Sequence, residues 1–186
     1  MTHLDLQKGN ILLAEPSLTG DVSFSRAVVL LAEHGLQGSV GFILNKPLHY
    51  TLDELVDEID APFPVFNGGP VEQDNLYFIH SRPELIKGSV EISDGIYWGG
   101  NFEVLTEAIN SHQLTKNDVR FFLGYSGWDA LQLLQEIDAK SWIPIQEQDL
   151  KKQLSKNAML LWKEKLKELG GDYLIWSNAP ENPNLN

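Results

Sequence analysis

Short hydrophobic runs, each bounded by turn-forming residues, occupy the first part of the chain. Segments 9–15 and 26–34 are apolar, and 39–45 follows them after a Gly-Leu-Gln-Gly turn. Runs of this length are typical of strands. Because only this short turn separates 26–33 from 39–44, these two runs are predicted to form an antiparallel hairpin. Their nearly continuous hydrophobicity indicates that both faces of the sheet are covered.

Apolar residues at helical spacing mark several later segments. Thr51 and Glu54 have the spacing of a capping box, and Asn101 is well placed to cap a helix that follows it. Gly170 and Gly171 are expected to end the last helix. The predicted helices are 51–59, 102–112, 129–137 and an amphipathic stretch from 147 to 169.

The remaining apolar segments read as strands between these helices. They are 64–70, 75–81, two short strands within 88–101, 119–126, 141–145 and 172–177. Short antiparallel pairs mixed with helices favour an α+β fold, with a mixed and strongly curved or barrel-like sheet and flanking helices. We expect one domain over residues 1–186, with a polar C-terminal tail from about 179 to 186.

The composition narrows the possible partners. With 26 acidic and 14 basic residues, the net charge is −12, which opposes binding to a phosphate backbone. Lysines are concentrated between 151 and 167, so a local basic face stays open, but direct DNA binding is disfavoured. The chain has no cysteine, which excludes thiol nucleophiles and thiolate metal sites. No run is long enough to span a membrane, and we expect a cytoplasmic protein.

Ser126 lies in the segment Gly124-Tyr125-Ser126-Gly127-Trp128, between a predicted strand and a predicted helix. A nucleophile elbow requires Gly-x-Ser-x-Gly, but Trp128 occupies the second glycine position. All five histidines also precede Ser126, which is the wrong order for a hydrolase of that class. We therefore interpret Ser126 as a small residue in a tight turn. A nonstandard pair of Ser126 and a histidine remains an alternative.

The histidines give no sign of a metal site. No two of them have the H-x-H or H-x-x-x-H spacing that ligands on one strand or helix would show. His34 and His80 stand near predicted strand ends, where a hydrogen-bonded structural role is common. We assign no catalytic residue, no metal and no cofactor.

Three glycine-rich turns follow predicted strands, at 67–70, 98–101 and 124–127. Glycine is favoured where φ is positive or where another group approaches the backbone closely. The turns could line one pocket with exposed N–H groups, and Trp98 and Trp128 could add an apolar wall. Ordinary turn formation and core packing are the alternatives. None of the turns matches a nucleotide-binding fingerprint.

The order of several motifs is distinctive: FSRAVVLLAEH, GSVGFILNKPL, NGGPV, LYFIHS, DGIYWGGNFEVL, FFLGYSGWDALQL and the ending PNLN. Together they resemble the YqgE/AlgH family of bacterial proteins over almost the whole chain. The resemblance implies an α+β domain with a barrel-like sheet in the bacterial cytosol. It implies no reaction, although some members carry the label of transcriptional regulator linked to exopolysaccharide production.

Two positions depart from the family pattern. Relatives often have alanine where this chain has Ser126, which suits a spacer rather than a nucleophile. After Trp128, relatives usually read Gly-Pro-Gly-Gln-Leu, whereas this chain begins a helix with Asp129 and Ala130.

We therefore predict a non-catalytic domain that binds a small molecule or a protein partner, with an indirect regulatory role. The alternatives are a transcriptional regulator and a hydrolase that uses His80 with Ser126 or water. The candidate ligand-binding residues are Arg26, Asn45, Gly68, Gly69, His80, Trp98, Gly99, Gly100, Tyr125, Ser126, Gly127 and Trp128.

Overall fold

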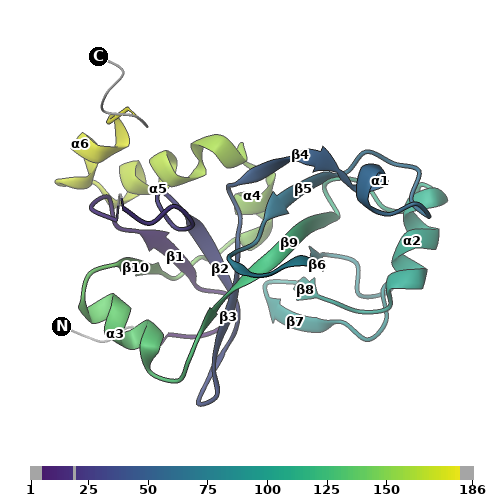
Figure 1. Ribbon diagram of the computed structural model, residues 1–186, viewed down its shortest axis with the longest axis horizontal. Coiled ribbons are helices and arrows are strands. Elements are labelled where there is room, and N and C mark those ends of the chain that lie inside the picture. The colour runs from purple at the N-terminus through teal and green to yellow at the C-terminus, as the bar shows by residue number, and fades with distance from the viewer. Residues whose placement is uncertain (1–5, 19, 181–186) are drawn as a thin grey trace.

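The computed structural model describes residues 6–18 and 20–180, and its strands form one ten-stranded sheet (Figure 1). The polar tail predicted from about 179 therefore lies largely outside the described residues. The strands are β1 (Ile11–Ala14), β2 (Val28–Gly35), β3 (Gly38–Ile43), β4 (Pro47–Thr51), β5 (Pro64–Asn67), β6 (Val71–His80), β7 (Val90–Ser93), β8 (Ile96–Trp98), β9 (Val119–Trp128) and β10 (Trp142–Ile145).

The helices flank this sheet. They are α1 (Leu52–Leu55), α2 (Phe102–Asn110), α3 (Gln132–Asp138), α4 (Leu150–Ser155), the 3₁₀ turn η1 (Ala158–Leu160), α5 (Leu161–Leu169) and α6 (Tyr173–Ser177). Two predicted N-termini are confirmed. Asn101 accepts a hydrogen bond from the N–H of Val104, and Thr51 and Glu54 form a capping box at α1.

The sheet is mixed, which confirms the predicted fold class. Its main strand order is β10-β1-β2-β3-β9-β6-β8-β7, and β4 and β5 attach to β9 beside this path. Neighbours pair antiparallel except β5 and β9, which are parallel. The hairpin predicted from 26–33 and 39–44 is β2 and β3. In the described part of the chain the two end strands do not pair with each other, so the curved sheet stays open.

β9 connects the two halves of the sheet and runs through the middle of the molecule (Figure 1). Along one edge it pairs with β6 from Val119 to Tyr125. Along the other edge it pairs first with β5, at 121–123, and then with β3, at 126–128. The turn after β5 lies where β9 changes from pairing with β5 to pairing with β3, and we call this place the β9 junction. There Gly68 bonds to both strands: its N–H donates to the carbonyl of Leu123, and its carbonyl accepts from the N–H of Ile43.

Three clusters of buried side chains make up the core. Helices α4 and α5 cover one face of β1, β2, β3 and β9 and contribute Leu150, Trp162 and Leu166. Helix α2, with α1, covers β5, β6 and β9 in the other half of the sheet. Helix α3 packs through Leu133 on the opposite face of β1, β2 and β3. Coverage of β1 to β3 on both faces explains their continuous hydrophobicity.

Several predicted elements differ from the structure. The helical stretch predicted from 147 to 169 is divided into α4, η1 and α5, because Lys156 is extended, and the strand β4 was not predicted. Segment 172–177 was expected to be a strand but forms the helix α6, because Gly170 and Gly171 have φ values of 70° and 55° and turn the chain back onto α5. Its apolar residues stay partly in solvent, with Ile175 at 75% exposure, so the run of hydrophobic letters did not mark a buried strand. The predicted helix 51–59 ends after Leu55, because Val56 is extended.

Backbone contact at the β9 junction requires glycine. An added Cβ at Gly69, where φ is 152°, would lie 2.2 Å from the carbonyl carbon of Tyr125. A Cβ at Gly68 would lie 2.2 Å from the carbonyl oxygen of Gly124. These atoms belong to the backbone and cannot rotate away, so a side chain would separate β5 from β9.

We expect Gly69→Ala to lower the free energy of unfolding by about 3 kcal/mol or more, because the methyl group forces the two backbones apart. Gly35→Ala is the matched control: its Cβ meets no atom within 4 Å, so a change of about 0.5 kcal/mol or less is expected. Urea unfolding of both variants measures the difference. Equal stabilities would contradict the proposed role of the junction.

Candidate functional site

One hollow in the described part of the molecule has a volume of about 540 Å³. It lies between the loop before β2, the start of β4 and the helix α5. Its polar lining includes Arg26, Asn45, Lys46 and Lys163, and its apolar lining includes Met159 and Trp162. We call it the Arg26 hollow. It combines two residues predicted from the sequence with residues about 120 positions later in the chain.

Arg26 has an unusual backbone conformation and unusual partners. Its φ is 56°, which is uncommon for a residue other than glycine. The guanidinium carbon lies 5.0 Å from the ring centroid of Trp162, as in a cation–π contact. Nη2 donates to the carbonyl of Pro180 at 2.6 Å, whereas Nη1 is buried and has no hydrogen-bond partner among the described residues. Within the described residues, this guanidinium therefore has one buried donor group without a hydrogen-bond partner.

Asn45 positions Arg26 through the backbone. Its Oδ1 accepts from the N–H of Val28 at 2.8 Å, and its Nδ2 donates to the carbonyl of Arg26 at 2.8 Å. Both ends of the amide are thus engaged across the start of β2. The side chain fixes the strained turn that carries Arg26.

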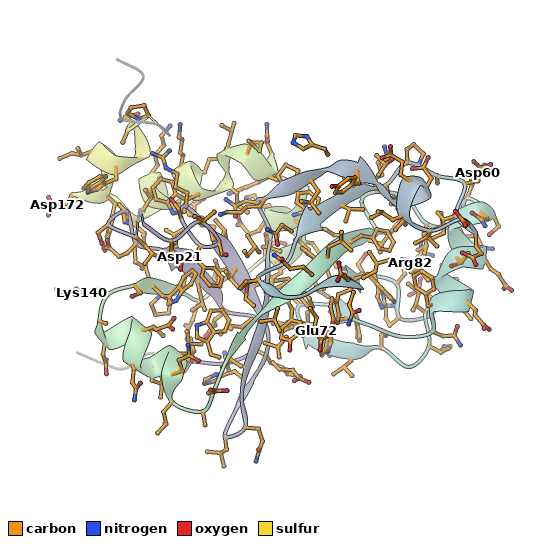
Figure 2. All side chains as sticks on the ribbon, in the orientation of Figure 1. Asp21, Asp60, Glu72, Arg82, Lys140 and Asp172 are labelled. Atoms are coloured by element: carbon orange, nitrogen blue, oxygen red, sulfur yellow. The ribbon has the colours of Figure 1, made fainter. Side chains whose placement is uncertain are left out.

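The charge in this hollow is positive. Burial lowers the pKa of the Lys46 ammonium, and nearby Asp21 opposes this effect. Lys46 is held by the carbonyl of Ser23, 2.6 Å from its Nζ. None of the described residues that line the hollow is acidic. Apart from Asp21, which lies near Lys46, carboxylates such as those of Asp60 and Asp172 project at opposite ends of the molecule (Figure 2).

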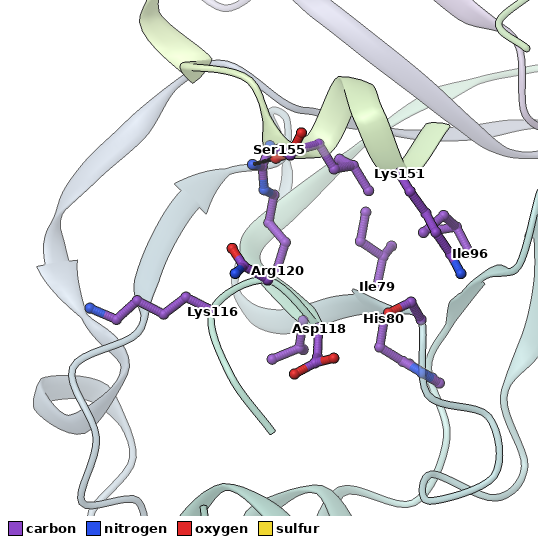
Figure 3. Close-up of a pocket in the computed structure, with 12 residues that line it drawn as sticks. Ile79, His80, Ile96, Lys116, Asp118, Arg120, Lys151 and Ser155 are labelled. Atoms are coloured by element: carbon purple, nitrogen blue, oxygen red, sulfur yellow. Dashed lines mark hydrogen bonds between the residues drawn. The ribbon is translucent and has the colours of Figure 1, made fainter. Parts of the chain in front are cut away.

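His80 lines a different and smaller hollow, of about 100 Å³. It lies between α4 and the place where the end of β6 pairs with the start of β9 (Figure 3). The side chain is 1% exposed. Nδ1 accepts from the N–H of Arg82 at 3.2 Å, so the proton resides on Nε2, which donates to the carbonyl of Gly99 at 3.1 Å. Burial lowers the pKa of His80, and the bond to Gly99 partly opposes this. Both ring nitrogens of the neutral imidazole are therefore occupied.

Two cations near His80 do not converge on one point. The guanidinium of Arg120 points toward Ser155, whereas Lys151 extends toward Ile96 (Figure 3). Arg120 donates to the carbonyls of Leu44 and Leu154, at 3.1 and 2.7 Å. Burial lowers its pKa to about 10, so it stays charged at neutral pH. This arginine connects β9 to the end of α4.

Trp98, Gly99 and Gly100 line a third hollow, of about 270 Å³, beside β6 and β7. They share it with Tyr77 and Phe78 but not with Arg26, Asn45 or His80. The predicted residues that line a hollow thus lie in three separate hollows of the described part of the molecule rather than in one pocket.

The other predicted residues pack inside or beside the β9 junction. Ser126 is 0% exposed, and its hydroxyl donates to the carbonyl of Gly68 at 3.1 Å, so it acts as a small buried spacer. Tyr125 packs edge-on against Tyr77. Gly127 adjoins the ring of Tyr125, with 3.2 Å between an added Cβ and Cε2. Gly68 and Gly69 make the close backbone contacts described above.

Trp128 belongs to an interior network. Its Nε1–H and that of Trp142 both donate to Glu136 Oε2, each at 2.8 Å. The two rings also pack edge to face, 5.8 Å apart, and Phe24 contacts both. The ring supports the fold and is 5% exposed.

Sequence analysis missed Trp162 and Lys163 as site residues. The helical spacing predicted only an amphipathic face. Trp162 and Leu166 are buried on α5, whereas Met159 lies in η1 and is 57% exposed. The proximity of Trp162 to Arg26 follows from tertiary packing, because its Nε1–H donates to the carbonyl of Ala14 at 2.9 Å.

The lysine-rich stretch is interrupted by carboxylates. Lys165 is 3% exposed and bonds to Glu147 and Glu168. Lys156 pairs with Glu168 at 3.0 Å and with Glu164 at 3.8 Å. These pairs link α4, α5 and the segment before α4, and they reduce the positive charge that the stretch presents.

The described residues contain neither a candidate membrane-spanning helix nor a candidate metal-binding cluster. No helix combines the length and the apolar character needed to cross a bilayer. No group of three or more histidine, aspartate or glutamate side chains is arranged to hold a metal ion.

The open, mixed α+β sheet with its flanking helices is shared with known bacterial proteins. It resembles the solved structures of a protein from Corynebacterium diphtheriae, with a TM-score of 0.78 and 18% identity, and of the AlgH protein from Pseudomonas aeruginosa, with a TM-score of 0.72 and 24% identity. The first match covers 96% of this chain and 95% of the other, and the second covers 97% and 98%.

Sequence comparison gives the family. The model described as AlgH-like matches residues 11–174. A protein of Cytophaga hutchinsonii named UPF0301 protein is 43% identical over 185 residues, which cover 97% of this chain and 100% of that protein. One of the same name from Chlorobium limicola is 41% identical over 183 residues, covering 97% and 96%. The chain belongs to the AlgH-like family, as its motifs indicated.

The buried neutral His80 predicts an acid-dependent loss of stability. Because its pKa is lowered on folding, the unfolded chain binds this proton more readily below about pH 6.5. The contribution of His80 to the free energy of unfolding is complete above that pH and is lost as the pH falls through the lowered pKa. His80→Gln should therefore show a shallower decline in the free energy of unfolding as the pH falls below about 6.5.

Urea titrations at several pH values measure this slope. Phe78→Leu is the control. The ring centroids of Phe78 and His80 lie 6.0 Å apart, so this substitution loosens the same core without removing a titrating group. It should keep the slope of the wild type. If His80→Gln and the wild type decline in parallel, the buried imidazole is not responsible.

Proposed function

We propose that this protein is a non-catalytic binding domain whose Arg26 hollow takes a small anionic ligand with an apolar body. The observation that carries the proposal is the guanidinium of Arg26: the residue lines a hollow together with Lys46 and Lys163, and its buried Nη1 has no hydrogen-bond partner among the described residues. A buried donor without a partner is costly, and a carboxylate or phosphate oxygen would satisfy it with a charge-assisted hydrogen bond.

The apolar part of the ligand follows from the other walls. Pro47, Leu48 and Met159 line the same hollow, and the ring of Trp162 lies beneath the guanidinium. Ligand sites commonly combine apolar walls with a few directed polar groups. A carboxylic acid or phosphate monoester with an aliphatic or aromatic group fits this lining better than inorganic phosphate does.

The alternatives gain less support. A hydrolase would require a free base, but both nitrogens of His80 are engaged and Ser126 is inaccessible. Direct DNA binding would require a continuous basic face, but Lys156 and Lys165 pair with glutamates. A regulatory role therefore fits better as a consequence of ligand binding than as operator recognition.

Phenyl phosphate and its neutral analogue benzyl alcohol test the proposal. We expect saturable binding of phenyl phosphate in an NMR titration, with benzyl alcohol at least about tenfold weaker because it cannot pair with Arg26. Arg26→Lys keeps the positive charge but loses the planar donor fork, and should weaken binding. Equal affinities for the two probes would contradict the proposal.

Lys163 and Lys167 provide a matched pair on α5. Lys163 lines the hollow, and Lys167 is an exposed lysine one turn further along the helix. Lys163→Gln should weaken phenyl phosphate binding by about threefold to tenfold, while Lys167→Gln should leave it nearly unchanged. Equal losses would mean that the probe responds to the overall charge of α5 rather than to this hollow.

A further inference from the structure

The third hollow has a chemistry opposite to that of the Arg26 hollow. We call it the Trp98 groove, and it is lined by Glu33 from β2, Tyr77 and Phe78 from β6, and Trp98 and Gly99 at the end of β8, among others. Its volume is about 270 Å³. None of the described lining residues is basic. Glu33 supplies the one formal charge in this lining, and aromatic rings form much of the rest.

A local irregularity in β2 carries Glu33. The pairing of β2 with β3 shifts register between Leu31 and Glu33, which marks a β-bulge. Such bulges redirect a side chain and are frequent beside functional sites. Glu33 is exposed, and within the described residues it forms no ion pair. Its carboxylate is therefore free to meet a cation.

The aromatic wall is fixed by its own contacts. Phe42 lies behind it, with its ring centroid 5.7 Å from that of Trp98 and 5.8 Å from that of Tyr77. The hydroxyl of Tyr77 donates to Glu72, so this phenol already has its partner. Because these rings are held in place, a ligand would lose little energy in ordering them.

Gly99 differs from the glycines of the β9 junction. Its φ is 68°, and no atom lies within 4 Å of an added Cβ, so the space beside it is open. Its carbonyl accepts from the Nε2–H of the buried His80. The imidazole thus holds the turn that closes β8 and bounds the groove, which gives His80 a positioning role at this second place.

We propose that the Trp98 groove binds a small organic ammonium ion, with its positive charge between the Glu33 carboxylate and the ring of Trp98. Aromatic faces attract cations, and quaternary ammonium groups are commonly recognised by such rings together with a carboxylate. A metal ion fits less well, because carbon atoms of aromatic rings cannot replace its oxygen ligands. The groove shares no lining residue with the Arg26 hollow, so the two proposals stand or fall separately.

Choline and its neutral isostere 3,3-dimethylbutan-1-ol test the charge requirement. The two molecules have nearly the same shape and differ at the central nitrogen or carbon. Dissociation constants come from the NMR shifts of the backbone N–H groups of Gly99 and Gly100, which line the groove and remain in every variant. We expect choline to bind about fivefold to tenfold more tightly than the alcohol.

Two variants separate charge from shape. Glu33→Gln keeps the size of the side chain and should remove the preference for choline, whereas Glu103→Gln, an exposed acid on α2 outside the groove, should retain it. Trp98→Leu keeps an apolar wall without the aromatic face, and should weaken choline binding by about fivefold or more. Circular dichroism of each variant establishes that it is folded.

Three outcomes would overturn the proposal. Choline and the alcohol could bind equally to the wild type, or choline could give no saturable shift up to about 100 mM, the weak limit for a specific small-ligand site. Alternatively, Glu103→Gln could reduce choline affinity as much as Glu33→Gln does. The last result would assign the effect to the overall negative charge of the protein.

Discussion

Direct contact between two stretches of backbone, Gly68-Gly69 and Gly124-Tyr125, holds this fold together. An added Cβ at Gly124 would lie 2.6 Å from the carbonyl oxygen of Gly69, and one at Gly68 would lie 2.2 Å from the carbonyl oxygen of Gly124. Because no side chain stands in the way, the residue after β5, Gly68, fits between β3 and β9. Its carbonyl accepts a hydrogen bond from the N–H of Ile43. β9 can then pair with β5 and with β3 along one edge, which joins both halves of the sheet.

Several residues of the recognisable sequence motifs hold the backbone around the hollows in place through hydrogen bonds. Asn45 uses its whole amide to hold the backbone around Arg26, and His80 holds the carbonyl of Gly99. Tyr77 has its hydroxyl engaged by Glu72. Among the described residues, fewer groups lack a hydrogen-bond or ion-pair partner, and the two proposals rest on these: the Nη1 of Arg26, the ammonium of Lys163 and the carboxylate of Glu33. Rigid supports of this kind reduce the entropy that a bound ligand would cost.

The elements could be predicted where the signal was local. The β2–β3 hairpin and the cap at Asn101 depend on residues a few positions apart, and both are confirmed. The apolar run at 172–177 predicts a buried strand, but this segment forms a short helix on which Ile175 is largely exposed. A hydrophobic run predicts a strand only when a partner strand is available to it.

The sites were less accessible to sequence reasoning. Arg26 and Asn45 could be singled out, but Trp162 reaches them through packing across more than 100 residues. Glycine letters were equally ambiguous. Gly69 is required by an opposing backbone, whereas Gly99 faces open space, and their sequence contexts are alike. Only the positions of the neighbouring atoms separate these two uses of the same residue.

The position of β9 along the chain affects how the protein folds during synthesis. Eight strands precede β9, and one edge each of β3, β5 and β6 pairs with it, while one edge of β1 pairs with β10 at 142–145. A nascent chain that ends before residue 119 therefore has exposed strand edges and lacks the strand that joins the two halves of the sheet. Such edges invite pairing with other chains, so the interval before β9 leaves the ribosome is the period in which this protein most needs protection.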